Sequence, residues 1–520
     1  MTTPTPLPQT ADPAPPMGRR SFWSRLSPKV SLGILMFLTL GGIAAFAILQ
    51  GIDRYPLDDA YIVQHSVQGI LIGSESRFLG SSPYDGVTSP IFVLLIALLS
   101  LVLPIPLAHW LVQAASLLAF AVGVFVLGRQ KDLSGPMSLL LSLIALISGM
   151  MIYHAFNGLE TGMAMAAVTW MLAALESEKP PKAGYVLAGL LCFIRPELAA
   201  LAGLAFLHIL RMKPFRRPEG WKAGFALAFG AFLSFVLLWT ALSGAPIPNT
   251  VSAKQYFFAD GCLPFGIKAR MLGLVTLSFL SVYGMSSVGF LFLGKSKKCG
   301  AVLFFFAAAF LSAYFLKSPG SIARNGQRYM YVLAPLALLG TASVIRSFLE
   351  RPIQDWRRFA FSWGLLLVLA LHAAFKLPER MEFLAKETAV YADHNRAAAR
   401  WMEAHVPEGK PVLIHDAGGV SLTGSHPLVD MVGLKTRFSV EVHRDITWKT
   451  CGEGMPEALD IIARHFGTEY ALIEDLFDSE NLLKVSLEKA GWRLELMSGE
   501  LGDNPYKVYR LQPPASAKED

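Results

Sequence analysis

Long apolar stretches recur between residues 30 and 375, and they constrain the fold of this chain more than any other feature. A helix needs about 20 apolar residues to cross the hydrocarbon core of a bilayer, and most of these stretches approach that length. Eleven are distinguishable, at about 30–50, 90–104, 107–127, 137–153, 160–175, 184–210, 221–243, 268–293, 300–316, 327–346 and 358–375. Only 16% of the 520 residues are charged, against about a quarter in soluble domains. The sequence therefore predicts an α-helical polytopic membrane protein with about 11 transmembrane helices.

Lysine and arginine residues gather in short clusters between the apolar stretches. The clusters lie near residues 19–29, 129–131, 179–182, 211–217, 295–298 and 346–358. Cytoplasmic loops of membrane proteins carry such an excess of basic residues, so the N-terminus and these loops are predicted to be cytoplasmic. The net charge of +7 does not indicate a nucleic-acid partner, because no basic stripe with interleaved aromatic residues is present.

The apolar stretches and basic clusters leave two arrangements open, and only the first places every basic cluster on one side. In the first, the stretch 90–104 lies at the outer interface, and 184–210 forms a short hairpin broken at Arg195–Pro196. In the second, 90–104 and 107–127 are two spans and 184–210 is one, which puts two basic clusters outside and ranks it lower. The first arrangement places 51–88, 154–160, 244–267 and 317–328 on the outer face, together with the chain after about residue 380.

Composition divides the chain into three parts. Residues 1–28 begin with a Pro- and Thr-rich segment and are predicted to form a disordered cytoplasmic tail. Residues 29–378 form the membrane domain with its outer loop 51–88, and 379–520 form an extracytoplasmic α/β domain. The four cysteines contain no CxxC pair, and their spacing indicates neither a disulfide framework nor a metal site.

Ionisable residues near membrane spans are costly to place and are candidates for function. Asp58 and Asp59, in "YPLDDAYI", follow the first apolar stretch. The other charged or polar candidates predicted on the same face are Glu160, Arg195, Glu197, Asn249, Lys254, Arg324 and Arg328, and the aromatic and His candidates are Tyr61, His65 and Tyr329. The structural alternatives are helix N-caps for the carboxylates and interfacial anchors for the Arg and Tyr side chains.

Transfer of a sugar from a lipid phosphate requires both the negative and the positive side chains among these candidates. A carboxylate takes the proton from the acceptor hydroxyl, and cations stabilise the departing phosphate. Asp58 or Asp59 is predicted to be the base, with Glu160 assisting it or positioning the acceptor. Arg195, Lys254 and Arg328 are predicted to bind the phosphate. A lipid-linked donor also explains why the site lies at a membrane.

Seven motifs in order resemble the GT-C superfamily of polytopic glycosyltransferases, most nearly its bacterial arabinofuranosyltransferase-like branch. They are "DDAYI", "YDGVTSPIFVLLIALL", "NGLETG", "FIRPEL", "PIPNTVSAK", "QRYMYVLAPLALL" and "IHDAGGVSLTGSHPLVDMVGL". The resemblance implies a site on the outer face of the bacterial inner membrane, a polyprenyl-monophosphate sugar donor, inversion at the anomeric carbon, and a first-loop Asp as base. Where relatives continue from "DDAYI" into an aromatic–Arg segment, this chain has "VQHSVQG" with His65.

Several properties stay open at this point. The acceptor is an extracytoplasmic glycan, glycolipid or protein, the sugar is unspecified, and a divalent cation is compatible with the carboxylates, although no full ligand set is evident. A transporter or lipid flippase is the main alternative, since broken helices and intramembrane charges suit that class, but the two halves of the chain show no internal repeat. A non-catalytic membrane assembly protein is the other.

Overall fold

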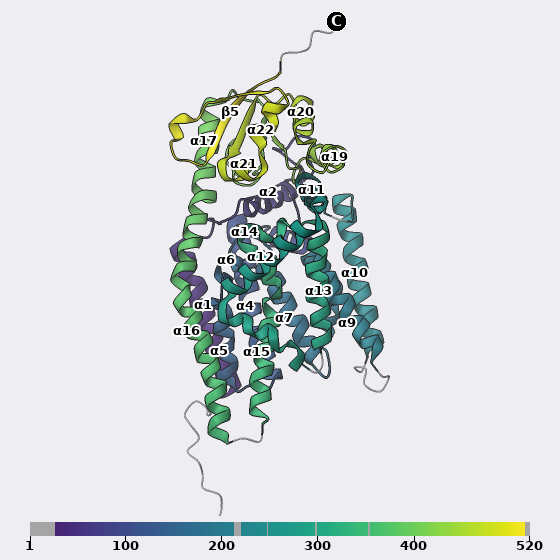
Figure 1. Ribbon diagram of the computed structural model, residues 1–520, viewed down its shortest axis with the longest axis vertical. Helices are drawn as coiled ribbons and strands as arrows, with labels where there is room; N and C mark the ends of the chain where they lie inside the picture. Colours follow the sequence, from purple (N-terminus) through teal and green to yellow (C-terminus); the bar gives the residue numbers. More distant parts are fainter. Residues whose placement is uncertain (1–25, 213–219, 247, 297–298, 352–353, 515–520) are drawn as a thin grey trace, which may run out of the picture.

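The computed structural model describes residues 26–212, 220–246, 248–296, 299–351 and 354–514. Most of the predicted disordered tail, and the basic residues at 213–217 and 297–298, lie outside the described residues. The described chain forms a bundle of helices with a small sheet domain at one end (Figure 1). This confirms the predicted fold class of a helical membrane protein with a C-terminal α/β domain.

Eleven helices run along the bundle. They are α1 (Pro28–Gln50), α4 (Ile105–Gln130), α5 (Gly135–Ile147), α7 (Thr161–Glu176), α8 (Lys182–Ile194), α9 (Ala199–Arg211), α10 (Trp221–Ser243), α12 (Phe265–Tyr283), α13 (Gly300–Lys317), α15 (Ala334–Leu349) and α16 (Asp355–Thr388). Seven helical segments among the described residues are long and apolar enough to cross a bilayer, and α5, α7 and α8 are shorter apolar helices. Helix starts follow local capping rules: the Ser27 hydroxyl accepts a hydrogen bond from Val30 N at 3.3 Å, ahead of Pro28 in the first turn.

Charged side chains distinguish the two ends of the bundle. At one end, Lys131 Nζ lies 2.7 Å from Glu176 Oε2, and Arg346 pairs with Asp132. This basic end gathers several of the predicted cytoplasmic clusters. At the other end, which we term the tail end because it carries the sheet domain, Arg195 faces Glu160 with Nη1 and Oε1 3.6 Å apart.

The segment 90–127 crosses the bundle once. Helix α3 (Pro90–Leu99) and α4 both begin at the tail end, since the Ser89 hydroxyl donates to the Phe193 carbonyl at 3.4 Å, and His109 Nε2 lies 2.9 Å from the Gly158 carbonyl oxygen. Helices α8 and α9 are separated at the same end by a single turn at Pro196–Leu198. Arg195 adopts an extended backbone (φ −154°) before this proline, which cannot continue the helical hydrogen bonding. The chain thus follows through the bundle the path of the first predicted arrangement.

Short elements connect the bundle to the sheet domain. Helix α2 (Asp59–Ile72) and α11 (Asn249–Phe258) lie between the two (Figure 1). Helix α16 continues through a π-helical turn at Ala389–His394 into α17 (Asn395–His405), so one helical rod carries the chain into the sheet domain. The remaining short elements of the bundle are α6 (Met151–Ala155), 3-10 helices at Asp260–Cys262, Gly284–Lys295, Ser321–Ala323 and Met330–Leu333, and α14 (Arg324–Gln327).

The sheet domain is a five-stranded sheet in the order β2-β1-β3-β5-β4. Its strands are β1 (Val412–Ile414), β2 (Leu428–Asp430), β3 (Tyr470–Glu474), β4 (Arg493–Leu496) and β5 (Tyr506–Gln512). Strand β1 pairs in parallel with β2 and β3, whereas β5 is antiparallel to β3 and β4. The helices are α18 (Gly419–Leu422), α19 (Arg437–Asp445), α20 (Met455–His465), α21 (Asp475–Asn481) and α22 (Leu483–Lys489). Strands β1 and β3, which pair in parallel, are buried throughout, as expected for parallel strands covered on both faces.

Candidate active site

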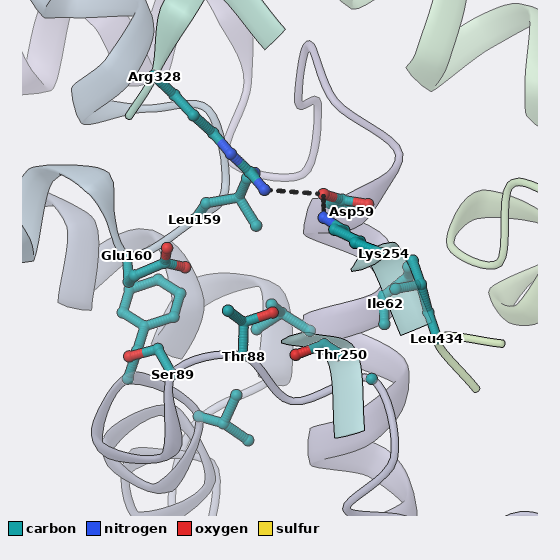
Figure 2. A pocket seen from close by; sticks show the side chains of 14 residues that line it. Asp59, Ile62, Thr88, Ser89, Leu159, Glu160, Thr250, Lys254, Arg328 and Leu434 are labelled. Atoms are coloured by element: carbon teal, nitrogen blue, oxygen red, sulfur yellow. Dashed lines mark hydrogen bonds and ion pairs between the residues drawn. The ribbon is translucent and has the colours of Figure 1, made fainter. Parts of the chain in front are cut away.

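A small cavity at the tail end collects charged residues from all four segments predicted to share the outer face (Figure 2). Asp59 begins α2, Glu160 precedes α7, Lys254 lies on α11, and Arg328 precedes the turn that leads into α15. The rest of the lining combines hydroxyl and apolar side chains: Thr88, Ser89, Thr250, Ile62, Val63, Phe92, Val93, Leu159 and Leu434. Leu434 belongs to the C-terminal domain, so the membrane and sheet parts enclose the cavity together.

Asp59 is the central carboxylate of this cavity. Its Oδ2 lies 3.3 Å from Arg328 Nη2 and 3.5 Å from Lys254 Nζ (Figure 2). Burial acts to raise the pKa of Asp59, but the two cations outweigh it and lower the pKa below its usual value. The lowered pKa keeps the carboxylate ionised at neutral pH. Its side chain is 25% exposed, so it is accessible from the cavities.

Arg328 has guanidinium donors with no hydrogen-bond partner among the described residues. Its Nη2 donates to Tyr329 Oη at 3.1 Å, and its guanidinium lies 4.9 Å from the centre of the Tyr329 ring. The side chain is 3% exposed, and its Nε and Nη1 have no hydrogen-bond partner within the described part of the chain. An unpaired buried guanidinium N–H is costly. These donors are therefore available to an anionic ligand in the cavity.

Arg195 is held behind Glu160 in a buried polar network. Its Nε lies 2.8 Å from Glu197 Oε1, and its guanidinium stacks over the Tyr329 ring at 4.5 Å from the centre. Tyr314 Oη, from α13, donates to Glu197 Oε1 at 3.1 Å. Tyr314 was not among the predicted residues, although a phenol near the end of an otherwise apolar stretch was a signal that could have indicated it.

A larger second cavity, of about 510 Å³, adjoins the first between the bundle and the sheet domain. Asp59, Lys254 and Leu434 line both cavities. Tyr329 and Arg324 line the second, with Arg324 stacked on the Phe258 ring at 3.6 Å from its centre. Asp59 and Lys254 thus stand in the wall between two spaces of different size.

Asp58, the neighbour of Asp59, is bound by the C-terminal domain. Its two carboxylate oxygens accept hydrogen bonds from Gly418 N at 2.6 Å and Gly419 N at 2.7 Å, and Asn395 Nδ2 lies 3.3 Å from Oδ1. Burial raises the pKa of Asp58, and the nearby Asp416 carboxylate adds to the rise, against the opposing effect of the glycine N–H groups. Asp58 lines only the second cavity.

Gly418→Ala is expected to displace the loop after β1 from Asp58. A Cβ at Gly418 would lie 2.0 Å from the Asp58 carbonyl oxygen, a contact that the backbone has to relieve. Losing the two N–H bonds to a buried carboxylate should cost about 1.5–3 kcal/mol per bond. Limited proteolysis should therefore cut the C-terminal domain faster in this variant. Gly499→Ala is the matched control, because its Cβ would meet nothing within 4 Å; equal cleavage of the two variants would contradict the assignment.

Three of the predicted residues make contacts outside the two cavities. Tyr61 Oη accepts a hydrogen bond from Tyr55 N at 2.9 Å, and His65 Nε2 lies 2.7 Å from Glu75 Oε1. Asn249 Nδ2 donates to the Leu434 carbonyl at 3.2 Å. Burial lowers the pKa of His65, although Glu75 opposes this effect. Tyr61 thus packs within the first loop, and Asn249 contacts the C-terminal domain directly. His65 is connected to that domain through Glu75, whose Oε2 lies 3.0 Å from Lys435 Nζ.

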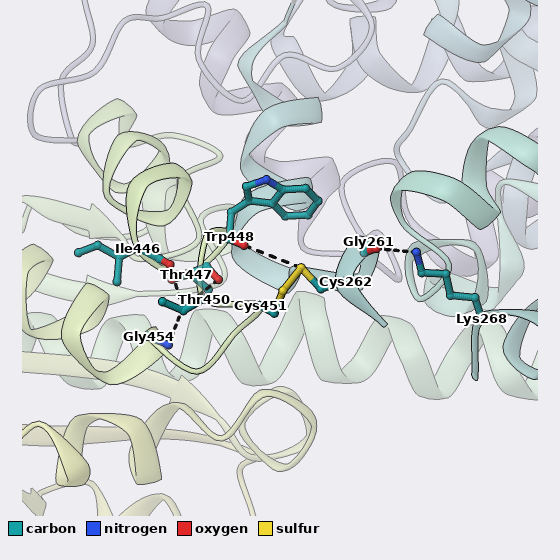
Figure 3. Close-up of a disulfide and its surroundings, with 9 residues drawn as sticks. All are labelled: Gly261, Cys262, Lys268, Ile446, Thr447, Trp448, Thr450, Cys451 and Gly454. Carbon is teal, nitrogen blue, oxygen red and sulfur yellow. Dashed lines mark hydrogen bonds between the residues drawn. A yellow bond between two sulfur atoms is a disulfide. The ribbon is translucent and has the colours of Figure 1, made fainter. Parts of the chain in front are cut away.

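A disulfide joins Cys262, in the loop after α11, to Cys451 of the C-terminal domain (Figure 3). The prediction that the cysteines form no disulfide framework is wrong on this point. The two cysteines are 189 residues apart, and neither belongs to a recognisable spacing motif, so only the fold brings them together. With the contacts of Asp58 and Asn249, this bond ties the C-terminal domain to the segments that line the cavities.

Cys451→Ser is expected to loosen the C-terminal domain. Removing a disulfide that closes a long loop typically costs about 2–4 kcal/mol. The variant should show a lower thermal midpoint and faster proteolysis of residues after 405 than the wild-type protein. Cys192→Ser, which removes a half-buried free thiol, is the control. Mass spectrometry without reductant checks the bond itself, and a free Cys262 in the wild-type protein would contradict the pairing.

The structure offers no evident metal centre in the described ranges. No three His, Cys, Asp or Glu side chains among the described residues are grouped so as to hold an ion.

The fold resembles that of known membrane glycosyltransferases. Aligned with ArnT from Cupriavidus metallidurans bound to undecaprenyl phosphate, the chain has a TM-score of 0.54 at 11% identity, covering 91% of this chain and 97% of ArnT. Arabinofuranosyltransferase AftD from mycobacteria gives 0.49 at 13% identity, covering 93% of this chain, and the chain spans only 39% of the length of AftD. The oligosaccharyltransferase of Archaeoglobus fulgidus gives 0.49 at 11% identity, covering 91% and 73%.

Two further comparisons concern the sequence. Residues 384–509 match the model of a family described as a domain of unknown function (DUF8728). No curated protein matches the chain. The likeness to ArnT establishes the fold: the chain has a GT-C-like fold and is a multi-pass membrane protein.

Proposed function

We propose that this protein is an inverting glycosyltransferase that moves a sugar from a polyprenyl-monophosphate donor to an extracytoplasmic glycan, glycolipid or protein. One observation carries the proposal: the carboxylate of Asp59 stands in the wall between two cavities, beside Lys254 and Arg328. Transfer from a phosphate leaving group requires a base that can reach the acceptor and cations that can reach the phosphate.

The lining of the first cavity, rather than its volume of about 20 Å³ in the free protein, suits the head of a lipid phosphate. Its lining combines apolar side chains with Arg328 and Lys254, and Arg328 has unpaired N–H donors. Arginine binds phosphate oxygens in a bidentate manner, and lysine adds a point charge. The fold supports this assignment, because ArnT has been solved bound to undecaprenyl phosphate. Arg195 contacts Glu160 and Glu197 instead, so in this proposal it positions Glu160 and the Tyr329 ring.

The reaction is a single displacement. Asp59 takes the proton of an acceptor hydroxyl, whose oxygen forms a bond with the anomeric carbon of the donor sugar. The bond between that carbon and the phosphate oxygen breaks, and polyprenyl monophosphate leaves with the electron pair. Arg328 and Lys254 stabilise the charge that develops on the phosphate. Attack from the face opposite the leaving group inverts the anomeric carbon.

The geometry favours Asp59 over Asp58 as the base, although the raised pKa of Asp58 would make it the stronger one. A base must first reach the proton that it removes. Both Asp58 oxygens already accept backbone N–H bonds, and Asp58 does not line the first cavity. Asp59 lines both cavities, and its partners are the cations that a donor phosphate would engage.

Donor binding is expected to increase the basicity of Asp59. In the free protein, Lys254 and Arg328 lower the pKa of Asp59. When these cations contact a phosphate, their stabilisation of the ionised carboxylate weakens and its pKa rises. The acid limb of kcat/KM should therefore lie below the ordinary Asp value of about 3.9, and the acid limb of kcat should lie at higher pH. Rate profiles between pH 3 and 8 test this order, and the reverse order would contradict it.

The same proposal fixes the orientation in the cell. The protein would lie in the bacterial inner membrane with its N-terminus in the cytoplasm and its tail end outside. The basic loops support this orientation. The disulfide between Cys262 and Cys451 supports it independently, because disulfides persist in oxidising, extracytoplasmic compartments.

The test is sugar transfer in membranes that contain the full chain. Labelled polyprenyl-monophosphate pentoses and hexoses are supplied separately, and transfer is compared with vector membranes. Wild-type membranes are expected to release polyprenyl monophosphate and label an endogenous acceptor with at least one donor. No transfer above the vector with any donor would reject the proposal and favour the transporter or assembly alternatives.

A further inference from the structure

The second cavity has a strongly acidic lining. Seven carboxylates face it, against the two basic side chains of Lys254 and Arg324. The Asp58 carboxylate accepts hydrogen bonds from the glycine N–H groups, and the Asp59 carboxylate is paired with the two cations, Lys254 and Arg328. Of the other five, Asp260 accepts a hydrogen bond from Gly320 N at 3.2 Å, and Glu480 lies on α21. The remaining three reach the cavity from the helical rod and from the carboxyl ends of two neighbouring strands: Glu387 on α16, Asp416 after β1 and Glu474 at the end of β3.

No cation neutralises this group in the described part of the chain. Asp416 Oδ2 accepts a hydrogen bond from Tyr506 Oη at 2.6 Å, and Glu474 accepts from Leu476 N and Phe477 N, all of them neutral donors. The Glu387 carboxylate has neither a hydrogen bond nor an ion pair with a described residue. Burial, with the Asp416 carboxylate adding to it, raises the pKa of Glu474 despite its backbone hydrogen bonds. The group therefore retains capacity to accept hydrogen bonds from a ligand.

His415 adds a buried donor to the same wall. Its side chain is fully buried, and Nε2 accepts a hydrogen bond from Glu474 N at 2.8 Å, so the proton of the neutral ring lies on Nδ1. Nδ1 forms no hydrogen bond in the described ranges, although one Asp416 oxygen lies 3.3 Å away. The ring stacks on Phe477 with centres 4.3 Å apart, and Tyr391 and Phe258 supply further aromatic surface.

Together, the carboxylates, the His415 donor and the aromatic rings favour one class of ligand, an uncharged sugar with several hydroxyl groups. Hydroxyl groups donate hydrogen bonds to carboxylates, and the C–H faces of a sugar ring pack against aromatic rings, as in small-molecule sites that combine apolar walls with a few convergent polar groups. A ligand with a phosphate or carboxylate group would be repelled by the carboxylates of Glu387, Asp416 and Glu474, which no described cation neutralises. The first cavity differs, since two nitrogens of Arg328 have no hydrogen-bond partner among the described residues and can donate to an anion.

We propose that the second cavity binds the acceptor, and that the part of the acceptor which enters it is an uncharged, hydroxyl-rich glycan end rather than a phosphorylated or carboxylated one. This inference rests on the proposed glycosyl transfer, because it places the attacking hydroxyl beside Asp59 from the side opposite the donor. It also gives the C-terminal domain a role, since Asp416, Glu474 and His415 select the acceptor.

The experiment uses the full chain in lipid nanodiscs and a glycan array with matched neutral, phosphorylated and uronic-acid oligosaccharides. The wild-type protein is expected to retain neutral glycans at least about tenfold better than their anionic counterparts. Asp416→Asn and Glu387→Gln should each weaken this binding about tenfold, the scale of a lost hydrogen bond to a charged group. Glu387→Lys should shift preference toward the anionic glycans. Glu408→Gln, at an exposed position outside the cavity, is the control.

Binding of polyprenyl monophosphate to the same samples shows that each variant is folded. It also measures ligand binding in the first cavity separately from the second. Preference of the wild-type protein for anionic glycans, no retained glycan at all, or variants that bind like Glu408→Gln would each overturn the inference. Sugar transfer onto an anionic acceptor end would overturn it while leaving the proposed function intact. Neutral-glycan binding that depends on Asp416, with no transfer from any donor, would support the cavity assignment and reject the transferase.

Discussion

Asp59→Asn is expected to lower sugar transfer by about 10²- to 10⁴-fold, the usual contribution of a general base. Asparagine keeps the size of the side chain but cannot accept the acceptor proton. The substitution also removes the negative charge between Lys254 and Arg328, so donor phosphate should bind at least as well as before. The loss should therefore appear in kcat and not in the KM for donor, measured with purified protein and a labelled polyprenyl-monophosphate sugar.

Asp58→Asn separates the roles of the two carboxylates. An amide places an NH₂ group opposite the N–H groups of Gly418 or Gly419, so this variant should expose the C-terminal domain to protease. Asp59→Asn should keep the wild-type proteolysis pattern. If Asp58→Asn abolishes transfer while its C-terminal domain stays protected, Asp58 is the base and the assignment here is wrong. If both variants transfer at the wild-type rate, the site has no catalytic carboxylate in this loop.

Arg328→Gln is expected to lower kcat by about 10²- to 10³-fold, the effect of removing one preorganised donor from a developing negative charge. The side chain is buried and its Nε and Nη1 have no partner in the described chain, so its charge is directed at the cavity. Arg328→Lys should recover part of the rate, because lysine keeps the charge but not the planar pair of donors. Arg444→Gln, at an exposed position of α19, is the matched control.

The readout for Arg328 is a single-turnover assay with donor in excess, combined with titration of polyprenyl monophosphate. Weaker binding of the lipid phosphate should accompany the slower step, since the same guanidinium contacts the phosphate before and after the bond breaks. A variant that binds the lipid phosphate normally and transfers at the wild-type rate would move the phosphate site away from Arg328. Lys254 and Arg195 would then be the remaining candidates.

The sequence alone determined the helical membrane fold and which charged residues lie at the same end of the bundle. Apolar stretches near 20 residues long have few alternatives to helices in a bilayer, and the basic clusters fix which loops share a side. That was enough to predict that Asp59, Glu160, Lys254 and Arg328 lie at one end of the bundle, where the structure places them in one cavity. Pro196 likewise indicated the break between α8 and α9.

Only the tertiary structure decided which contacts each of these residues makes. Asp58 and Asp59 are adjacent and chemically identical, and they differ because successive residues at a helix start point in different directions, one toward Gly418 and Gly419 and the other toward Arg328. The pairing of Cys262 with Cys451, and the wall that Asp416 and Glu474 contribute to the second cavity, arise from contacts between segments far apart in sequence. Hydropathy and charge patterns report the preferences of each segment for lipid or water, whereas such contacts depend on how the C-terminal domain docks.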